Sequence, residues 1–226
     1  MAIQGTLVLL VFVIFLGYSR ASDPDMLQDI CVATTTSGGC SLTGIKVNGF
    51  PCKPDADVTA DDFFYAGLAQ PAVVNNTLGS LVRAANVQAI PGLNTLGVSI
   101  SKIDYNPDGL NPPHTHPRAT EVVFVLEGEL DVGFITTGNR LIAKTIKKGE
   151  IFVFPRGLVH YQKNNGMMPA SAIVAFNSQL PGTQSIATTL FGSTPAVADN
   201  VLAKAFQVDA VVVQGIKAKL GPKPSY

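Results

Sequence analysis

The sequence predicts an all-β domain that ends in α-helices. Between about Leu96 and Phe176, short runs of β-branched and aromatic residues alternate with turn residues at a spacing of roughly 8–12 residues, which is typical of a sandwich or barrel. After Pro195 the apolar residues instead recur every three to four positions, as they do along one face of a helix. With 226 residues and 46% hydrophobic content, the chain is long and apolar enough to bury one sizeable core.

The β-segment divides into apolar runs separated by Gly, Pro and Asn. These runs are Gly97–Tyr105, Val122–Leu126, Leu130–Ile135, Leu141–Ile146, Ile151–Phe154, Leu158–Gln162 and Ser171–Phe176. Pro112-Pro113 and Glu127-Gly128 are among the turn signals between them. We therefore predict short strands joined by turns over this part of the chain. Ahead of it, the residues from Asp61 to Tyr65 predict a short helix.

The segment after Pro195 predicts helices. Asp199 and Asp209 precede groups of apolar residues at helical spacing, where they are placed as N-caps. The apolar positions are Val201, Leu202, Ala205, Phe206, Val212, Val213, Ile216 and Leu220. Because a closed β-core needs no helical lid, we expect this apolar face to pack on another subunit; packing on the chain's own barrel is the alternative.

The N-terminus carries a pattern typical of secretion. Leu7 to Leu16 is an unbroken apolar run of ten residues, too short to span a bilayer, and the small-x-small triplet Ser19-Arg20-Ala21 follows it. We predict a signal peptide over residues 1–21, although its first part has no Lys or Arg; an N-terminal core strand is the alternative. Residues 22–226 then form one secreted domain, with an arm over about 22–60, a barrel core over about 61–195 and a helical part over about 196–226.

Export makes three further features interpretable. Cys31, Cys40 and Cys52 can pair in an oxidising compartment, where their spacing permits three pairings and leaves one cysteine over. Asn75 begins an Asn-x-Thr sequon, which predicts a glycosylated surface loop. The 16 basic and 16 acidic residues produce no net field that would attract nucleic acid, and we expect no membrane association after signal cleavage.

The three histidines of the chain form one pattern with a carboxylate. His114 and His116 lie two residues apart, so in a strand both imidazoles point to the same face. Glu121 begins an apolar run, where a charge needs a partner. His160 follows a Pro-Arg-Gly turn and shares a strand face with Gln162 if that strand is regular. Each residue alone is more often an ordinary core or surface residue, but together they predict a metal site.

This spacing resembles the two motifs of the cupin superfamily. Gly109 with His114-x-His116-x4-Glu121-x6-Gly128 resembles the first motif, and Gly149-x5-Pro155-x-Gly157-x2-His160-x3-Asn164 matches the second. Further stretches are similar to germin-like proteins in particular, among them Val47-Asn48-Gly49-Phe50-Pro51-Cys52-Lys53 and Leu202-Ala203-Lys204-Ala205-Phe206. The resemblance extends over essentially the whole mature chain. It implies a cupin jelly-roll β-barrel with C-terminal α-helices.

The resemblance further implies a cofactor, a disulfide and an assembly. The three histidines and Glu121 would hold Mn2+, and Fe2+ also fits the geometry, because such a set leaves two octahedral positions open; tetrahedral zinc would leave none. Cys31 would pair with Cys52, which leaves Cys40 over. The helices would clasp neighbours in a homohexamer, a trimer of dimers, secreted to the plant apoplast and cell wall.

The residues expected to face a small-molecule substrate distinguish two reactions. In germins that oxidise oxalate, two asparagines reach the substrate; Asn111 fills the place directly before Pro-Pro-His, but the place ten residues earlier is Ser101. A shorter hydroxyl cannot reach as the amide does, which weakens the oxalate interpretation. Superoxide needs only an open position on a redox-active metal. We therefore expect an extracellular manganese superoxide dismutase, with oxalate oxidase and a non-catalytic cell-wall protein as the alternatives.

Overall fold

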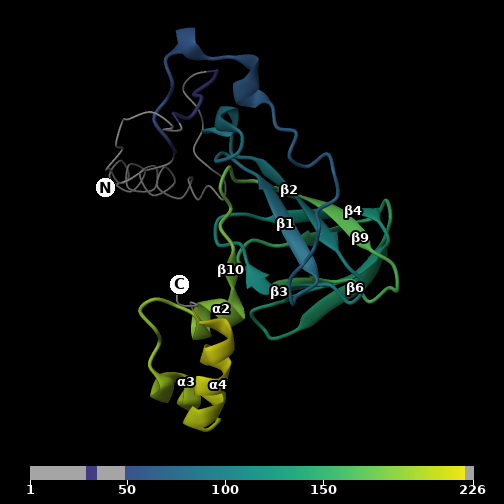
Figure 1. Ribbon diagram of the computed structural model, residues 1–226, viewed down its shortest axis with the longest axis vertical. Coiled ribbons are helices and arrows are strands. Elements are labelled where there is room, and N and C mark those ends of the chain that lie inside the picture. Colours follow the sequence, from purple (N-terminus) through teal and green to yellow (C-terminus); the bar gives the residue numbers. More distant parts are fainter. Residues whose placement is uncertain (1–28, 35–48, 222–226) are drawn as a thin grey trace, which may run out of the picture.

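Two antiparallel five-stranded sheets enclose the core of the domain (Figure 1). The computed structural model describes residues 29–34 and 49–221; the predicted signal peptide over residues 1–21 and Cys40 lie outside this part. One sheet has the order β1 (Ser80–Ala85), β2 (Ser99–Tyr105), β9 (Ala170–Phe176), β4 (Glu121–Glu127) and β7 (Ile151–Phe154). The other has the order β10 (Gln184–Ser185), β3 (Leu110–Thr115), β8 (His160–Lys163), β5 (Glu129–Ile135) and β6 (Leu141–Lys147).

The predicted all-β fold is confirmed, and its core lies between the two sheets. In β4 the side chains alternate, so that Val123 and Val125 are buried while Phe124 is exposed, as the two-residue period of a strand requires. The buried cluster takes residues from both sheets: Ile103, Tyr105, Ala119, Val123, Val125, Leu130, Val132, Ile146, Phe154, Ala170, Ala172, Val174 and Phe176. This cluster supports the strands that carry the four predicted ligands.

The strand that carries His114 differs from the prediction. The pair Pro112-Pro113 predicts a turn, but both prolines lie inside β3. The register between β3 and β8 shifts between Asn111 and His114, so the prolines lie at an irregularity of the ladder, where their missing N–H groups break no regular hydrogen bond. A further strand, β1, precedes the predicted β-segment and pairs with β2.

The C-terminal helices form a separate layer beside the barrel (Figure 1). These are α2 (Ile186–Phe191), α3 (Asp199–Phe206) and α4 (Ala210–Leu220). They pack on one another around a small core of Phe191, Leu202 and Val213. Asp209 is the N-cap residue of α4 as predicted, but Ala198 rather than Asp199 precedes α3. No helix among the described residues has both the length and the apolar character needed to cross a membrane.

The arm ahead of the barrel is held by a disulfide and a buried amide. Cys31 and Cys52 are joined, which is the pairing that the resemblance implied. The Asn94 side chain accepts a hydrogen bond from the Phe50 N–H and donates one to the Phe50 carbonyl. The predicted short helix is a 3-10 turn over Ala60–Phe63. Asn75 is exposed in the loop before β1, so the surface position that its sequon requires is present, while its glycosylation stays a prediction.

Candidate metal centre

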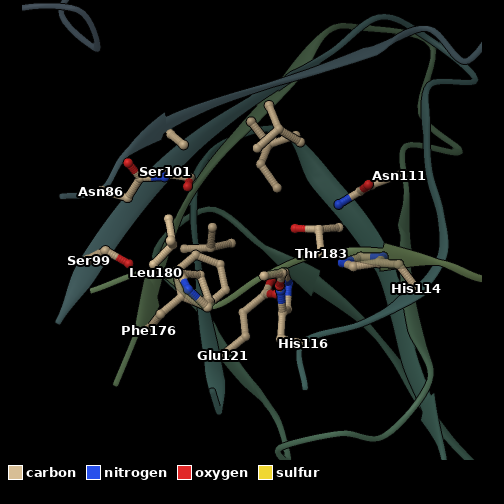
Figure 2. A pocket seen from close by; sticks show the side chains of 16 residues that line it. Asn86, Ser99, Ser101, Asn111, His114, His116, Glu121, Phe176, Leu180 and Thr183 are labelled. Atoms are coloured by element: carbon tan, nitrogen blue, oxygen red, sulfur yellow. The ribbon is translucent and has the colours of Figure 1, made fainter. Parts of the chain in front are cut away.

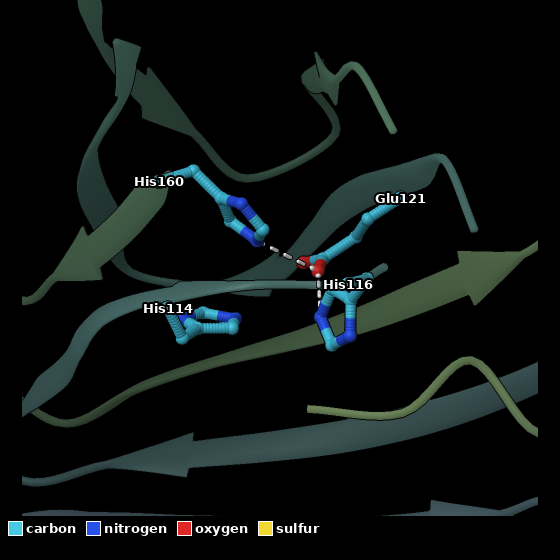
Figure 3. Close-up of side chains that lie close together, drawn as sticks. All are labelled: His114, His116, Glu121 and His160. Carbon is cyan, nitrogen blue, oxygen red and sulfur yellow. Dashed lines mark hydrogen bonds and ion pairs between the residues drawn. The ribbon is translucent and has the colours of Figure 1, made fainter. Parts of the chain in front are cut away.

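The four predicted ligands come from three strands and meet inside the barrel. His114 lies near the end of β3 and is paired in register with His160, the first residue of β8. His116 follows β3 directly, and Glu121 begins β4. All four side chains are buried, and their ligand atoms lie within 4.8 Å of one another. Figure 3 shows the three imidazole rings around the Glu121 carboxylate.

Backbone carbonyls fix the orientation of each imidazole. Nδ1 of His114 lies 2.7 Å from the Pro112 oxygen, and Nδ1 of His160 lies 2.8 Å from the Leu158 oxygen. Nδ1 of His116 makes the same contact with the oxygen of Gly182. A carbonyl only accepts, so each Nδ1 carries the hydrogen. In the neutral ring Nε2 then keeps its lone pair, which is the form that binds metals.

The acceptor atoms at the centre of the cluster require a cation between them. Oε2 of Glu121 lies 2.8 Å from Nε2 of His116 and 3.2 Å from Nε2 of His160. A carboxylate oxygen and neutral Nε2 atoms are all acceptors, so at these distances they repel one another unless a proton or a metal ion neutralises them. Three imidazoles and one carboxylate match the ligand preference of a divalent transition metal. The donor set therefore fits a manganese or iron ion.

The electrostatics of the site favour the metal-binding protonation states of Glu121 and His114. Burial raises the pKa of Glu121, but in the metal-free site protons on Nε2 of His116 and His160 supply hydrogen bonds and charge that outweigh this effect and lower it to about 2. Burial, helped by the charge of His160, lowers the pKa of His114 from 6.5 to about 4. At neutral pH, Glu121 is thus ionised and His114 is neutral.

A buried glutamine completes the surroundings of the carboxylate and was not predicted as a site residue. Nε2 of Gln162 donates to Oε1 of Glu121 at 2.7 Å, and Oε1 of Gln162 accepts from Nδ2 of Asn111 at 2.6 Å. The signal was present in the sequence, because Gln162 lies two residues after His160 and therefore on the same strand face. Residue type alone predicts only His and Glu as metal ligands, so it does not identify Gln162.

A pocket of about 270 Å³ opens onto the cluster. Figure 2 shows His114, His116 and Glu121 at its base, with Asn111 on one side and Ser101 on the other. The rest of the lining is mostly apolar and includes Val82, Ile103, Val174, Phe176 and Leu180. Asn111, the predicted substrate contact, and Ser101, which stands in the place of the second asparagine, both line the pocket.

One wall of this pocket is attached to the loop between β3 and β4, which carries His116. The wall is the segment 180–183, which leads into β10. Arg118 donates from Nε to the Leu180 oxygen at 2.8 Å, and its own N–H donates to the Pro181 oxygen at 3.3 Å. Gly182 has φ +70°, a backbone conformation that residues with a side chain rarely adopt, so this turn favours glycine.

Comparisons with known proteins place this chain among related ones. A family model described as Cupin matches residues 66–214. Over 218 residues the chain is 64% identical to germin-like protein subfamily 2 member 1 of Arabidopsis thaliana, covering 96% of this chain and 97% of that protein. It is 66% identical over 199 residues to the rhicadhesin receptor of Pisum sativum, covering 88% and 89%. A solved structure of recombinant oxalate oxidase in complex with glycolate matches with a TM-score of 0.83 and 44% identity, covering 88% of this chain and 98% of that one.

Proposed function

This chain belongs to the germin-like proteins of the cupin family, and we propose that it is a secreted manganese protein that dismutates superoxide. The observation that carries the proposal is the buried cluster of three histidines and Glu121 at the base of an open pocket. His114, His116, Glu121 and His160 would hold the ion, each through one atom. Bound manganese would supply one-electron oxidation and reduction.

The lining of the pocket supports a small, weakly recognised substrate. Dismutation converts two superoxide ions and two protons into oxygen and hydrogen peroxide, and it requires access to the metal more than orientation of the substrate. Asn111 has one N–H already committed to Gln162, and Ser101 offers only a short hydroxyl. The rest of the lining carries no charged donor, and its other polar side chains are Asn86, Ser99 and Thr183. A diatomic anion needs fewer hydrogen bonds than a dicarboxylate does.

Oxalate oxidation is the competing enzymatic function, because a solved relative with that activity in its name shares the fold at 44% identity. Oxalate must be oriented by hydrogen bonds to its free oxygens, since an anion without them is poorly desolvated. The hydroxyl of Ser101 extends less far toward a substrate than the amide of an asparagine at that position would. A non-catalytic role at the cell surface is the third candidate, and the pea relative that is named a receptor favours it.

We also propose a homohexamer, a trimer of dimers, in the apoplast. Val201 and Val211 on the helices are 53% and 71% exposed, and Phe206 is also exposed. Such apolar surface beside a small helical core is stabilised when a second subunit covers it. The predicted signal peptide, the disulfide between Cys31 and Cys52 and the sequon at Asn75 all support secretion.

The test is an assay of both reactions on one secreted preparation whose metal content has been measured by elemental analysis. We expect about one manganese per chain, superoxide dismutation and little peroxide release from oxalate. Ser101→Asn should raise oxalate turnover and leave dismutation nearly unchanged. Stoichiometric manganese with ready oxalate turnover and no dismutation would make the protein an oxalate oxidase. A fully loaded protein without either activity would favour the non-catalytic role.

A further inference from the structure

Among the described residues, Gln162 is the one whose side chain donates a hydrogen bond to Oε1 of Glu121; the two histidine contacts are to Oε2. Its side chain has no exposed surface. Its backbone is held on both sides, because Gln162 is in register with Asn111 of β3 and with Val132 of β5. A buried amide costs free energy unless its polar atoms are bonded, and here both ends are bonded. The side chain is therefore fixed in one place.

The chemistry of the carboxylate sets the direction of this contact. An ionised Glu121 can only accept, so the amide nitrogen of Gln162 must face it. The amide oxygen of Gln162 then faces Asn111, which must donate through Nδ2. The order of donors and acceptors from Asn111 to Glu121 is thus determined by the charge of one metal ligand. One N–H and the carbonyl oxygen of Asn111 remain for the pocket.

The two oxygens of Glu121 consequently have separate tasks. Oε2 faces Nε2 of His116 at 2.8 Å and Nε2 of His160 at 3.2 Å, at the centre of the cluster. Oε1 is occupied by Gln162 at 2.7 Å. A carboxylate held in this way offers one oxygen to a metal and keeps the other turned away. The coordination positions that a second oxygen would take then stay open to small ligands.

We propose that Gln162 is a positioning residue that restricts Glu121 to binding a metal through one oxygen and couples the pocket residue Asn111 to the metal site. The proposal rests on the proposed function only in requiring that a metal binds. It assigns to Gln162 an effect on the metal itself, beyond its contribution to packing. Contacts around a metal ligand commonly change metal affinity by about 10–100-fold when they are removed.

The principal test compares two buried amides that lie two residues apart. Gln162→Met keeps the length of the side chain and removes both hydrogen bonds. Asn164→Leu is the matched control, because Asn164 is equally buried and donates to the Asn106 and Met168 carbonyls, away from the ligands. For each secreted full-length variant, Mn2+ affinity is measured by competition with a chelator, the Mn2+ EPR spectrum is recorded, and the melting temperature is determined with and without metal.

We expect Gln162→Met to bind Mn2+ about 10–100-fold more weakly and to change the zero-field splitting of the bound ion. Asn164→Leu should lower the melting temperature while its affinity and spectrum stay those of the wild type. Wild-type affinity and spectrum in Gln162→Met would overturn the inference, as would equal changes in both variants. A wild-type protein that binds no Mn2+ would instead overturn the proposed function, so the two failures are distinguishable.

Asn111→Leu provides a second measurement that does not depend on the folding of Gln162→Met. Asn111 is only partly buried, and its removal leaves the oxygen of Gln162 without its donor. We expect a smaller loss of Mn2+ affinity, with the same direction of change in the EPR spectrum. If the two residues act as a chain, the double variant should lose less than the sum of the two single losses in free energy. An additive double variant would show that Asn111 is not coupled to the metal site through Gln162.

Discussion

The metal end of the barrel and the C-terminal helices differ in where their partners come from. At the metal end, His114, Glu121 and Gln162 are buried and bonded to groups of the same chain. In the helices only Phe191, Leu202 and Val213 are buried, while other apolar side chains such as Phe206 and Val211 remain exposed. The difference indicates that one chain supplies all four residues of the metal centre by itself, whereas the exposed side chains of the helices are the surface that the proposed assembly would cover.

The largest expected effect is the loss of a ligand. Glu121→Gln removes the negative charge of the cluster and should weaken Mn2+ binding by more than about 100-fold, beyond the range seen for residues that only surround a ligand. The matched control is Glu129→Gln on β5, whose carboxylate is largely exposed near Lys147. Metal content after dialysis checks the prediction. Retention of stoichiometric manganese by Glu121→Gln would show that the cluster is not the metal site.

The next effect should leave the metal untouched. Leu202→Ala removes a buried side chain from the helical core and should cost that layer about 2–5 kcal/mol. Hydrogen exchange in α3 and α4 should accelerate and the proposed assembly should dissociate more readily, while the Mn2+ spectrum is retained. Val211→Ala, at a 71% exposed position, serves as the control for folding, because it should weaken assembly with little change in the folding of the helices.

If Leu202→Ala also lost its metal at a protein concentration where the chain is dissociated, the metal centre and the helices would not be independent of each other. It would mean that the barrel holds its ligands in place only when the helices are packed. Analytical ultracentrifugation beside elemental analysis distinguishes this outcome from simple dissociation.

The last expected effect is a dependence of metal-free stability on pH. The pKa of His114 is about 4 in the folded protein against 6.5 ordinarily, and that of Glu121 is about 2 against 4.5. Between the folded and the ordinary pKa of each group, the unfolded chain binds more protons than the folded one. The folded state is therefore stabilised at higher pH, and this stabilisation is lost as the pH falls. Acidification from pH 7 to 4 should cost on the order of 3 kcal/mol through His114. Urea unfolding of the metal-free protein measures this, and a flat profile between pH 6.5 and 4 would contradict it.

Much of the barrel could be predicted because its strands repeat with a period of two and are separated by turn residues. The strands from β4 to β9 fall close to the predicted runs. β3 could not be found in this way, because its two prolines are compatible with a turn and with a bulged strand, and only pairing with β8 decides between them. The N-cap of α3 is Ala198 and not the predicted Asp199. Here too a tertiary contact matters, because the Asp199 side chain pairs with Lys217 of α4.

The sequence by itself predicted the members of the cluster, because the two-residue period of a strand places His114 and His116 on one face and the spacing pattern adds Glu121 and His160. It also contained the contrast between Asn111 and Ser101, which is a matter of residue type. The tertiary structure alone decided how these groups are oriented. Gly182 holds the ring of His116 from a segment 66 residues away, and Gln162 takes one oxygen of Glu121 from another strand. Such contacts depend on which strands become neighbours. A local sequence pattern does not specify that pairing, because the paired residues are distant in the chain and meet only when the loops between them close.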